Sequence, residues 1–359
     1  MISTNWGELF PGRWSLVIFL SYMALFINQG IIVTWSQTNG QYEYNIVAVV
    51  LLTEILKLIV SAILYWKDFH VNNLEILKKI LLIDNSTFLV LLLYLIPSFL
   101  YCLYNNLAFI NLAVFDPTTY YVLLQFRVVM TGIIFQLIFK KKLSVKQWLS
   151  LLLLTLGCMI KHVNISMDED VSTKFVLNKN IYLIFIQVSL FDIVLFFLFT
   201  FCSCLAGVYN EYLLKQGANI NIFVQNVFMY IDSILCNVIV FLILFTCQTN
   251  VTNIFNNIGS SIFMQPKVII IMLNNTAIGI ITSFFLKNLN SILKTFASAL
   301  ELVFTAVLCW IIFDIPILIN TVISIAMVSN AVILYSQNPV HNEKSAEIES
   351  KKPLMERII

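Results

Sequence analysis

The chain has 359 residues, of which 60% are apolar and only 11% are charged, and its net charge at pH 7 is +2. A soluble domain usually carries about 25% charged residues, so this composition excludes an ordinary soluble protein. The small net charge gives no indication of a nucleic-acid partner.

Apolar stretches close to bilayer length run along almost the whole chain. A helix rises 1.5 Å per residue and needs about 20 apolar residues to cross roughly 30 Å of hydrocarbon. The expected spans are residues 14–34, 45–66, 87–110, 118–139, 144–160, 181–209, 222–245, 268–286, 291–313 and 315–335. The sequence therefore predicts an all-α polytopic membrane protein with ten transmembrane helices, a pattern typical of transporters and channels. The sixth stretch is too long for one straight helix, so we expect it to tilt or to begin at the interface.

An even number of spans places both termini on the same side of the membrane. The lysines that follow the second and fourth spans are Lys67, Lys78, Lys79, Lys140, Lys141, Lys142 and Lys146. The opposite loops hold fewer lysines, so the positive-inside rule predicts that both termini are cytosolic. We expect residues 1–13 to form a cytosolic N-terminus, residues 14–336 the transport domain and residues 337–359 a disordered cytosolic tail.

Two glycosylation sequons fit this topology. Asn164 and Asn250 each begin an Asn-x-Ser/Thr triplet in a loop that the topology places on the far side of the membrane. Glycosylation takes place on that side, so both asparagines are candidate acceptor sites.

Motifs of catalysis and of metal binding are missing from the sequence. Gly7 and Gly12 have the glycine spacing of a phosphate-binding loop, but Arg13-Trp14 follows where Lys-Ser/Thr is needed. The seven cysteines lie in or beside apolar helices, which favours buried small side chains over a metal site. We therefore expect no enzyme activity, no metal and no cofactor. Transport would be coupled to a gradient or to the exchange of one solute for another.

Several charged residues fall inside expected spans. A charge at the bilayer centre costs about 2.5–3.5 kcal/mol on insertion scales, so each one needs an explanation. Arg127 is a structural salt-bridge partner, an arginine that caps backbone carbonyls, or an anion-binding residue. Lys294 either reaches the interface or contacts substrate. Glu54 and Lys57 are three residues apart and can neutralise each other. Glu301 can pair with a basic group or line the pathway as a proton or substrate contact.

Polar residues accompany these charges on the same spans. They are Asn105, Asn106, Tyr120, Tyr121, Gln125, Asn226 and Tyr230. A single Asn or Tyr in a membrane helix usually bonds to a neighbouring helix. Several of them beside cations instead indicate a site for a polar ligand with a planar base.

The sequence also resembles a known family. In the first half the matching segments are Glu54–Leu58, Asn105–Phe109, Thr119–Val122, Gln125–Arg127, Leu143-Ser144 and Gln147–Ser150. In the second half they are Gly207–Glu211, Leu214-Lys215, Asn226–Tyr230 and Ser291–Phe296. Together these segments resemble the nucleotide-sugar transporters of solute carrier family 35, over nearly the whole chain outside its tails and the 161–180 loop. The details around residue 226 are most similar to the UDP-sugar transporter-like branch.

The resemblance implies a fold and a set of site residues. The fold is the drug/metabolite-transporter fold, with two inverted five-helix halves at about residues 14–162 and 181–336. By position, Arg127 and Lys294 would hold phosphate, and the nucleotide would be surrounded by Asn105, Tyr120, Asn226 and Tyr230. The family usually has lysine where Arg127 stands, and a small or uncharged residue where Glu301 stands.

The activity that the resemblance implies is exchange of a cytosolic nucleotide sugar for a lumenal nucleoside monophosphate. The resemblance favours a UDP-sugar and the Golgi membrane, with the ER membrane as an alternative. Transport of CMP-sialic acid, transport of another phosphorylated metabolite, and a non-transporting membrane scaffold also remain as alternatives. Assembly into a homo-oligomer stays open.

Overall fold

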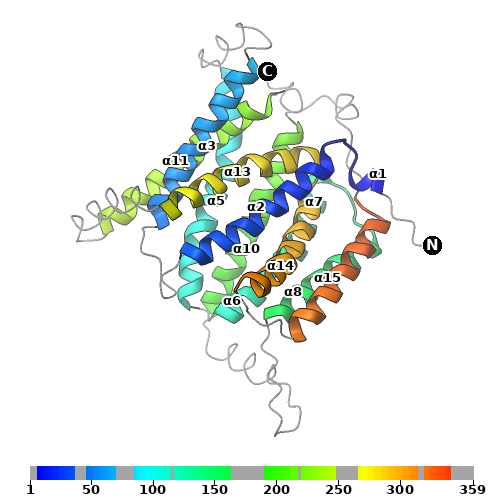
Figure 1. Cartoon of the computed structure of the whole chain (residues 1–359). Helices are drawn as coiled ribbons and strands as arrows, with labels where there is room; N and C mark the ends of the chain where they lie inside the picture. The colour runs from blue at the N-terminus through cyan, green and yellow to red at the C-terminus, as the bar shows by residue number, and fades with distance from the viewer. Residues whose placement is uncertain are drawn as a thin grey trace. The chain divides into compact units, whose positions relative to one another are not determined.

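The computed structural model describes residues 6–36, 46–69, 85–114, 117–162, 190–216, 220–247, 266–313 and 319–340. Every regular element in these segments is a helix (Figure 1). The helices are α1 (Trp6–Leu9), α2 (Ser15–Ser36), α3 (Ile46–Phe69), α5 (Asn85–Val114), α6 (Pro117–Leu124), α7 (Arg127–Phe139), α8 (Val145–His162), α10 (Leu190–Gln216), α11 (Ile222–Cys247), α13 (Pro266–Asn288), α14 (Ser291–Phe313) and α15 (Ile319–Gln337). Eight helical stretches among the described residues are long and apolar enough to cross a membrane, so the chain is a polytopic membrane protein.

The helices follow the expected spans closely, although eight candidate spans are fewer than the ten expected. The apolar part of α5 covers only Val90–Asn105, which is shorter than a full span. Helix α8 is outside the eight, since Lys146 and Lys161 stand near its two ends and shorten its apolar stretch. Of the sixth expected span, residues 181–189 lie outside the described residues, and α10 continues to Gln216 rather than ending at 209.

The fourth expected span, 118–139, is confirmed as a candidate membrane span over Tyr120–Phe139, but it is not one continuous helix. It consists of α6 and α7, separated by a turn at Gln125 and Phe126. In a regular helix the N–H of Gln125 would donate to the carbonyl of Tyr121. Here it donates to the Val122 carbonyl at 3.2 Å, while the Gln125 side chain donates to the Tyr121 carbonyl at 3.0 Å. The side chain thus replaces a backbone bond, and α7 begins at Arg127.

The chain forms two compact units that interleave along the sequence. Unit 1 contains Met1–Phe10, Leu103–Val208 and Ser291–His341, and unit 2 contains Pro11–Cys102, Tyr209–Asn290 and Asn342–Ile359. Each unit therefore combines helices from the first half of the chain with helices from the second.

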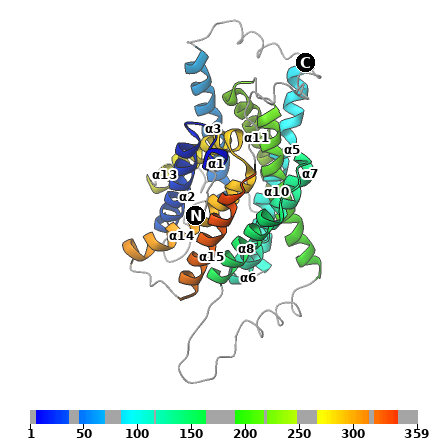
Figure 2. The same ribbon diagram turned by 90° about the vertical axis from the view of Figure 1, so that its right-hand side faces the viewer.

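Unit 1 is built around the pairing of α8 with α15, which lie side by side (Figures 1 and 2). Gly157 permits this close approach, because a Cβ atom there would lie 3.0 Å from the Cβ of Met327 and 3.4 Å from the backbone nitrogen of Val328. Helix α14 packs against both α7 and α15. The rings of Phe296 and Tyr335 stack at 4.4 Å between α14 and α15.

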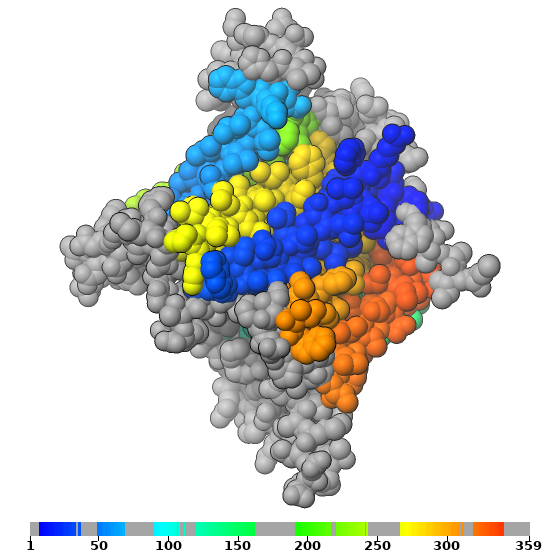
Figure 3. Space-filling model, in the orientation of Figure 1, coloured from blue at the N-terminus to red at the C-terminus, as the bar shows by residue number. Residues whose placement is uncertain are grey.

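Unit 2 contains α2, α3, α11, α13 and parts of α5 and α10. Figure 3 shows α3, α13 and α2 as neighbouring ridges on one face. Asn28 donates a hydrogen bond to Asn274 at 3.0 Å, which joins α2 to α13. Tyr94 of α5 donates to Gln225 of α11 at 2.8 Å. These bonds between helices satisfy polar groups that lipid cannot satisfy.

Large apolar side chains cover much of the outer surface of the helices. Val145 is 84% exposed, Leu137 71% and Ile63 60%. A soluble protein rarely exposes apolar side chains over so many helices, because water penalises that area. The surface fits a protein whose outer solvent is lipid.

Candidate anion-binding pocket

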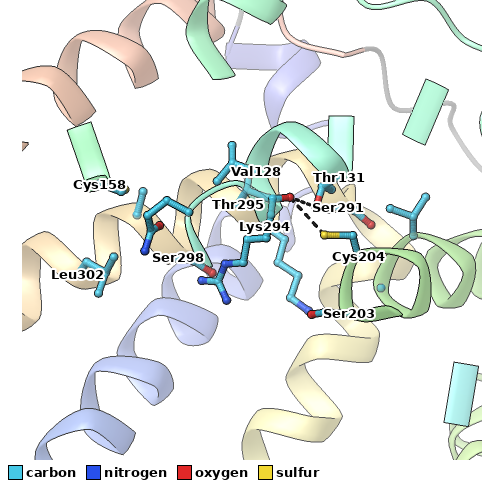
Figure 4. A pocket seen from close by; sticks show the side chains of 15 residues that line it. Val128, Thr131, Cys158, Ser203, Cys204, Ser291, Lys294, Thr295, Ser298 and Leu302 are labelled. Carbon is cyan, nitrogen blue, oxygen red and sulfur yellow. Dashed lines mark hydrogen bonds between the residues drawn. The ribbon is translucent and has the colours of Figure 1, made fainter. Parts of the chain in front are cut away.

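A pocket in unit 1 lies among α7, α8, α10 and α14 (Figure 4). The residues that line it are Gln125, Arg127, Val128, Thr131, Cys158, Ser203, Cys204, Gly207, Val208, Ser291, Lys294, Thr295, Ser298, Ala299 and Leu302. Two of these side chains are cationic, and five carry hydroxyl groups. None of the described residues that line the pocket carries a carboxylate. The pocket therefore has the composition of a site for a polar anion.

The turn between α6 and α7 positions Arg127 at the pocket. Its carbonyl oxygen accepts a hydrogen bond from Thr131 Oγ1 at 2.7 Å and another from Cys204 Sγ at 3.3 Å, drawn as dashed lines in Figure 4. These two bonds hold the backbone at the start of α7. The guanidinium group is half-buried and makes no hydrogen bond or ion pair with any residue that the structure describes. It is therefore available to an external anion, with the positive end of the α7 dipole beside it.

Lys294 reaches the same pocket from the first turns of α14. Its side chain is half-buried and extends toward Ser203 of α10 (Figure 4). Both Lys294 and Arg127 lie within electrostatic range of the Cys204 side chain, so the two cations act on one region of the pocket. A guanidinium group suits two phosphate oxygens at once, and an ammonium group adds a point charge. Together they can hold a phosphate or diphosphate group.

Hydroxyl groups complete the lining and were not singled out by the sequence. Ser291, Thr295 and Ser298 recur on one face of α14, at the spacing of helical turns around Lys294. This spacing is visible in the sequence and could have identified them. Ser203 of α10 gives no such signal, because only the packing of distant segments brings it to the pocket.

Glu301 is not among the residues that line the pocket. It stands between two lining residues, three positions after Ser298 and one before Leu302. Arg127 and Lys161 both lie within electrostatic range of its carboxylate. The Lys161 ammonium group donates to the Leu302 carbonyl at 2.8 Å. The carboxylate is thus close enough to influence the pocket without being part of its wall.

Two other expected site residues of unit 1 do not reach this pocket. Asn105 is exposed on α5. Tyr120 of α6 is buried against Phe196 and Phe199 of α10, in a cluster of aromatic rings. Burial among aromatic neighbours is the usual environment of a core residue.

The remaining expected residues lie in unit 2. Glu54 and Lys57 form an ion pair at 2.8 Å, and the Lys57 ammonium group stands 5.8 Å from the centre of the Tyr230 ring. Tyr230 and Asn226 are each 1% exposed on α11. The amide nitrogen of Asn226 has no hydrogen-bond partner among the described residues. Unit 2 thus holds its own buried polar cluster.

Three expectations fall outside the part of the chain that the structure describes. They are the sequons at Asn164 and Asn250 and the tail beyond residue 340.

Apolar helices around a cation-lined pocket define a membrane protein that can hold an anionic solute. Comparison with known proteins gives the family. The model of the nucleotide-sugar transporter family matches residues 14–336, so the chain belongs to that family. It is a transporter and not an enzyme, in agreement with the names of its relatives.

Two relatives and one solved structure illustrate the similarity. The chain is 55% identical to the UDP-galactose transporter senju of Drosophila melanogaster, over 95% of this chain and 91% of that protein. It is 29% identical to CMP-sialic acid transporter 1 of Oryza sativa subsp. japonica, over 84% of this chain and 88% of that protein. A crystal structure with 10% sequence identity superposes with a TM-score of 0.60, over 91% of this chain and 97% of that one, which shows a shared fold.

Proposed function

We propose that the protein carries a UDP-sugar, with UDP-galactose as the first candidate, from the cytosol into the Golgi lumen in exchange for a nucleoside monophosphate. The observation that carries this proposal is the pocket of unit 1, which Arg127 and Lys294 both line and to which no described residue contributes a carboxylate. The similarity to a protein named as a UDP-galactose transporter supports the choice of sugar nucleotide.

Exchange follows from the chemistry of the two solutes. A nucleotide sugar and its nucleoside monophosphate share a base, a ribose and a phosphate, so one cationic pocket can bind either. Two cations in an apolar protein are costly when they are not compensated. A bound phosphate compensates Arg127 and Lys294, and this favours movement of the loaded carrier over movement of the empty one.

The proposal includes the inverted five-helix halves that the family resemblance implies. The packing of helices supports it, if α6 and α7 count as one span. The contact of α7 with α8 in the first half has a counterpart in the contact of α14 with α15 in the second half. The α8–α15 contact joins the fifth spans of the two halves, and the α3–α11 contact joins the second spans. Exchange of the halves would preserve these contacts, as alternating access by inverted repeats requires. The contacts of α13 with α2 and α3 have no counterpart among the stronger contacts of the described residues, so the support comes from part of the packing.

The test is counterflow in proteoliposomes. Vesicles loaded with UMP should take up labelled UDP-galactose, whereas empty vesicles should take up much less. Arg127→Ala should reduce uptake to background, because the pocket loses its bidentate phosphate contact. Lys267→Ala is the matched control, since Lys267 contacts the Trp35 ring in unit 2 and does not line the pocket. Uptake by Arg127→Ala at the wild-type rate would contradict the proposal.

A second candidate is transport of CMP-sialic acid, which the similarity to rice proteins of that name favours. Loading the same vesicles with UMP, CMP or GMP separates the two. Stimulation by UMP supports a UDP-sugar, and stimulation by CMP supports the alternative. If no nucleotide stimulates uptake or shifts the melting temperature of the purified protein, the membrane scaffold becomes the better interpretation.

A further inference from the structure

A carboxylate lies near the cationic lining of the pocket, within electrostatic range of Arg127. Glu301 is half-buried on α14, seven residues after Lys294, and so on roughly the same face of that helix. Ser298 and Leu302, on either side of it in the sequence, both line the pocket. Because Glu301 itself does not line the pocket, its carboxylate would act on a bound solute through its charge and not through direct contact with the solute.

Among the residues that the structure describes, none forms a close ion pair with Glu301. The ion pairs found among the described residues are Glu54–Lys57 and Glu211–Lys215, and neither involves Glu301. Arg127 and Lys161 are within electrostatic range of its carboxylate, but Lys161 donates its hydrogen bond to the Leu302 carbonyl. Glu301 therefore reduces the positive potential of the pocket while leaving the Arg127 guanidinium available to a solute.

Such a fixed negative charge penalises each ligand in proportion to the ligand's own charge. UMP and a UDP-hexose each carry about two negative charges, whereas a UDP-uronate carries a third on the sugar. For a separation on the order of 10 Å and an effective dielectric constant of about 20, one extra ligand charge weakens binding by about tenfold. We propose that Glu301 is a specificity-determining residue, which makes the pocket favour nucleotide sugars with an uncharged sugar over those whose sugar carries a carboxylate. This inference rests on the proposed function and names the substrate class of the same site.

UDP-glucose and UDP-glucuronate provide a matched pair of probes, because they differ only at the sugar C6 group. Each is used to compete with labelled UDP-galactose uptake into UMP-loaded proteoliposomes. In the wild type, UDP-glucuronate should need the higher concentration for half inhibition. Glu301→Gln keeps the shape of the side chain and removes its charge. In this variant the half-inhibitory concentration of UDP-glucuronate, divided by that of UDP-glucose, should fall about tenfold.

Two further variants make the result specific. Glu301→Asp keeps the charge and should keep most of the wild-type ratio. Asp192→Asn removes a carboxylate from the first turn of α10, in unit 1 but away from the pocket lining, and should leave the ratio unchanged. If Glu301→Gln takes up too little substrate to measure, the melting-temperature shifts that the two probes cause in purified protein give the same ratio.

The outcomes separate this inference from the proposed function. An unchanged ratio in Glu301→Gln, with UDP-galactose uptake intact, contradicts the role of Glu301 alone. If vesicles that contain the wild-type protein take up no UDP-sugar, whichever nucleotide they are loaded with, the proposed function is contradicted. A ratio that falls in Glu301→Gln and equally in Asp192→Asn also overturns the inference, because the effect would then follow from net charge and not from position.

Discussion

At the scale of single residues, the pocket depends on two cations of different chemistry. Arg127 presents a planar fork, whereas Lys294 presents a point charge on a flexible stem. The backbone of Arg127 is held by bonds from Thr131 and Cys204, and this limits where the fork can point. A change of residue type at the two positions should therefore have unequal effects.

We expect Arg127→Lys to keep uptake of UDP-galactose but to raise the KM by about tenfold, because one bidentate contact is replaced by a single charge. Lys294→Arg should change the KM less, because Lys294 contributes only a positive charge and arginine keeps that charge. Initial rates of uptake over a range of substrate concentrations measure both values. Equal effects at the two positions would contradict this division of roles.

At the scale of elements, the interruption between α6 and α7 is the feature that places Arg127 at a helix start. The Gln125 side chain takes the Tyr121 carbonyl that a continuous helix would use. Gln125→Leu removes this bond and favours a continuous helix, so Arg127 should lose its place in the pocket. We expect uptake to fall by about fivefold, which corresponds to the loss of one hydrogen bond of roughly 1 kcal/mol.

Gln136→Leu provides the control for this prediction. Gln136 is a half-buried glutamine in the regular part of α7, and it does not line the pocket. Its replacement should leave uptake close to the wild-type value. Equal losses in the two variants would show that the loss reflects general damage to α7.

The pairing of α8 with α15 makes a second prediction at this scale. Replacement of Gly157 by Val should push these helices apart, because the new atoms would meet the Cβ of Met327 and the backbone of Val328. Overpacking of this kind costs about 1–3 kcal/mol, so the melting temperature in detergent should fall by several degrees. Gly7→Ala is the control, since nothing lies within 4 Å of a Cβ at that position. An unchanged melting temperature in Gly157→Val would show that the contact yields without cost.

At the scale of the whole molecule, the exposed apolar helices agree with a chain that spans the membrane several times. The lysine distribution predicts that both termini face the cytosol. Epitope tags at the two ends should both be accessible to protease in intact vesicles whose outer face is the cytosolic face, without permeabilisation. Protection of one tag would mean an odd number of spans, and protection of both would mean the reverse orientation.

The sequence predicts those features that depend on neighbouring residues. Apart from α10, the apolar runs locate the long helices to within a few residues, and α14 begins and ends where expected, at Ser291 and Phe313. Arg127 and Lys294 stand out because a charge among apolar neighbours is rare. The turn before Arg127 was missed, because Gln125 sits in an unbroken apolar pattern and only its side-chain bond interrupts the helix.

The sequence alone could not predict features that depend on packing between distant segments. The sequence does not show that the ring of Tyr120 packs against Phe196 and Phe199 of a distant helix. Ser203 lines the pocket through the same helix, for which the sequence offers no periodic signal. Contacts between segments about 80 residues apart decide both cases.

The interleaving of the two units has a consequence for biosynthesis. Helix α8 packs against α15, which the ribosome makes more than 150 residues later, and α2 similarly packs against α13. The early helices must therefore leave the translocon without their final partners and remain in lipid until the end of the chain is made. Truncation before α15 should leave α8 exposed to quality control, so even a late nonsense mutation should remove the protein from the membrane.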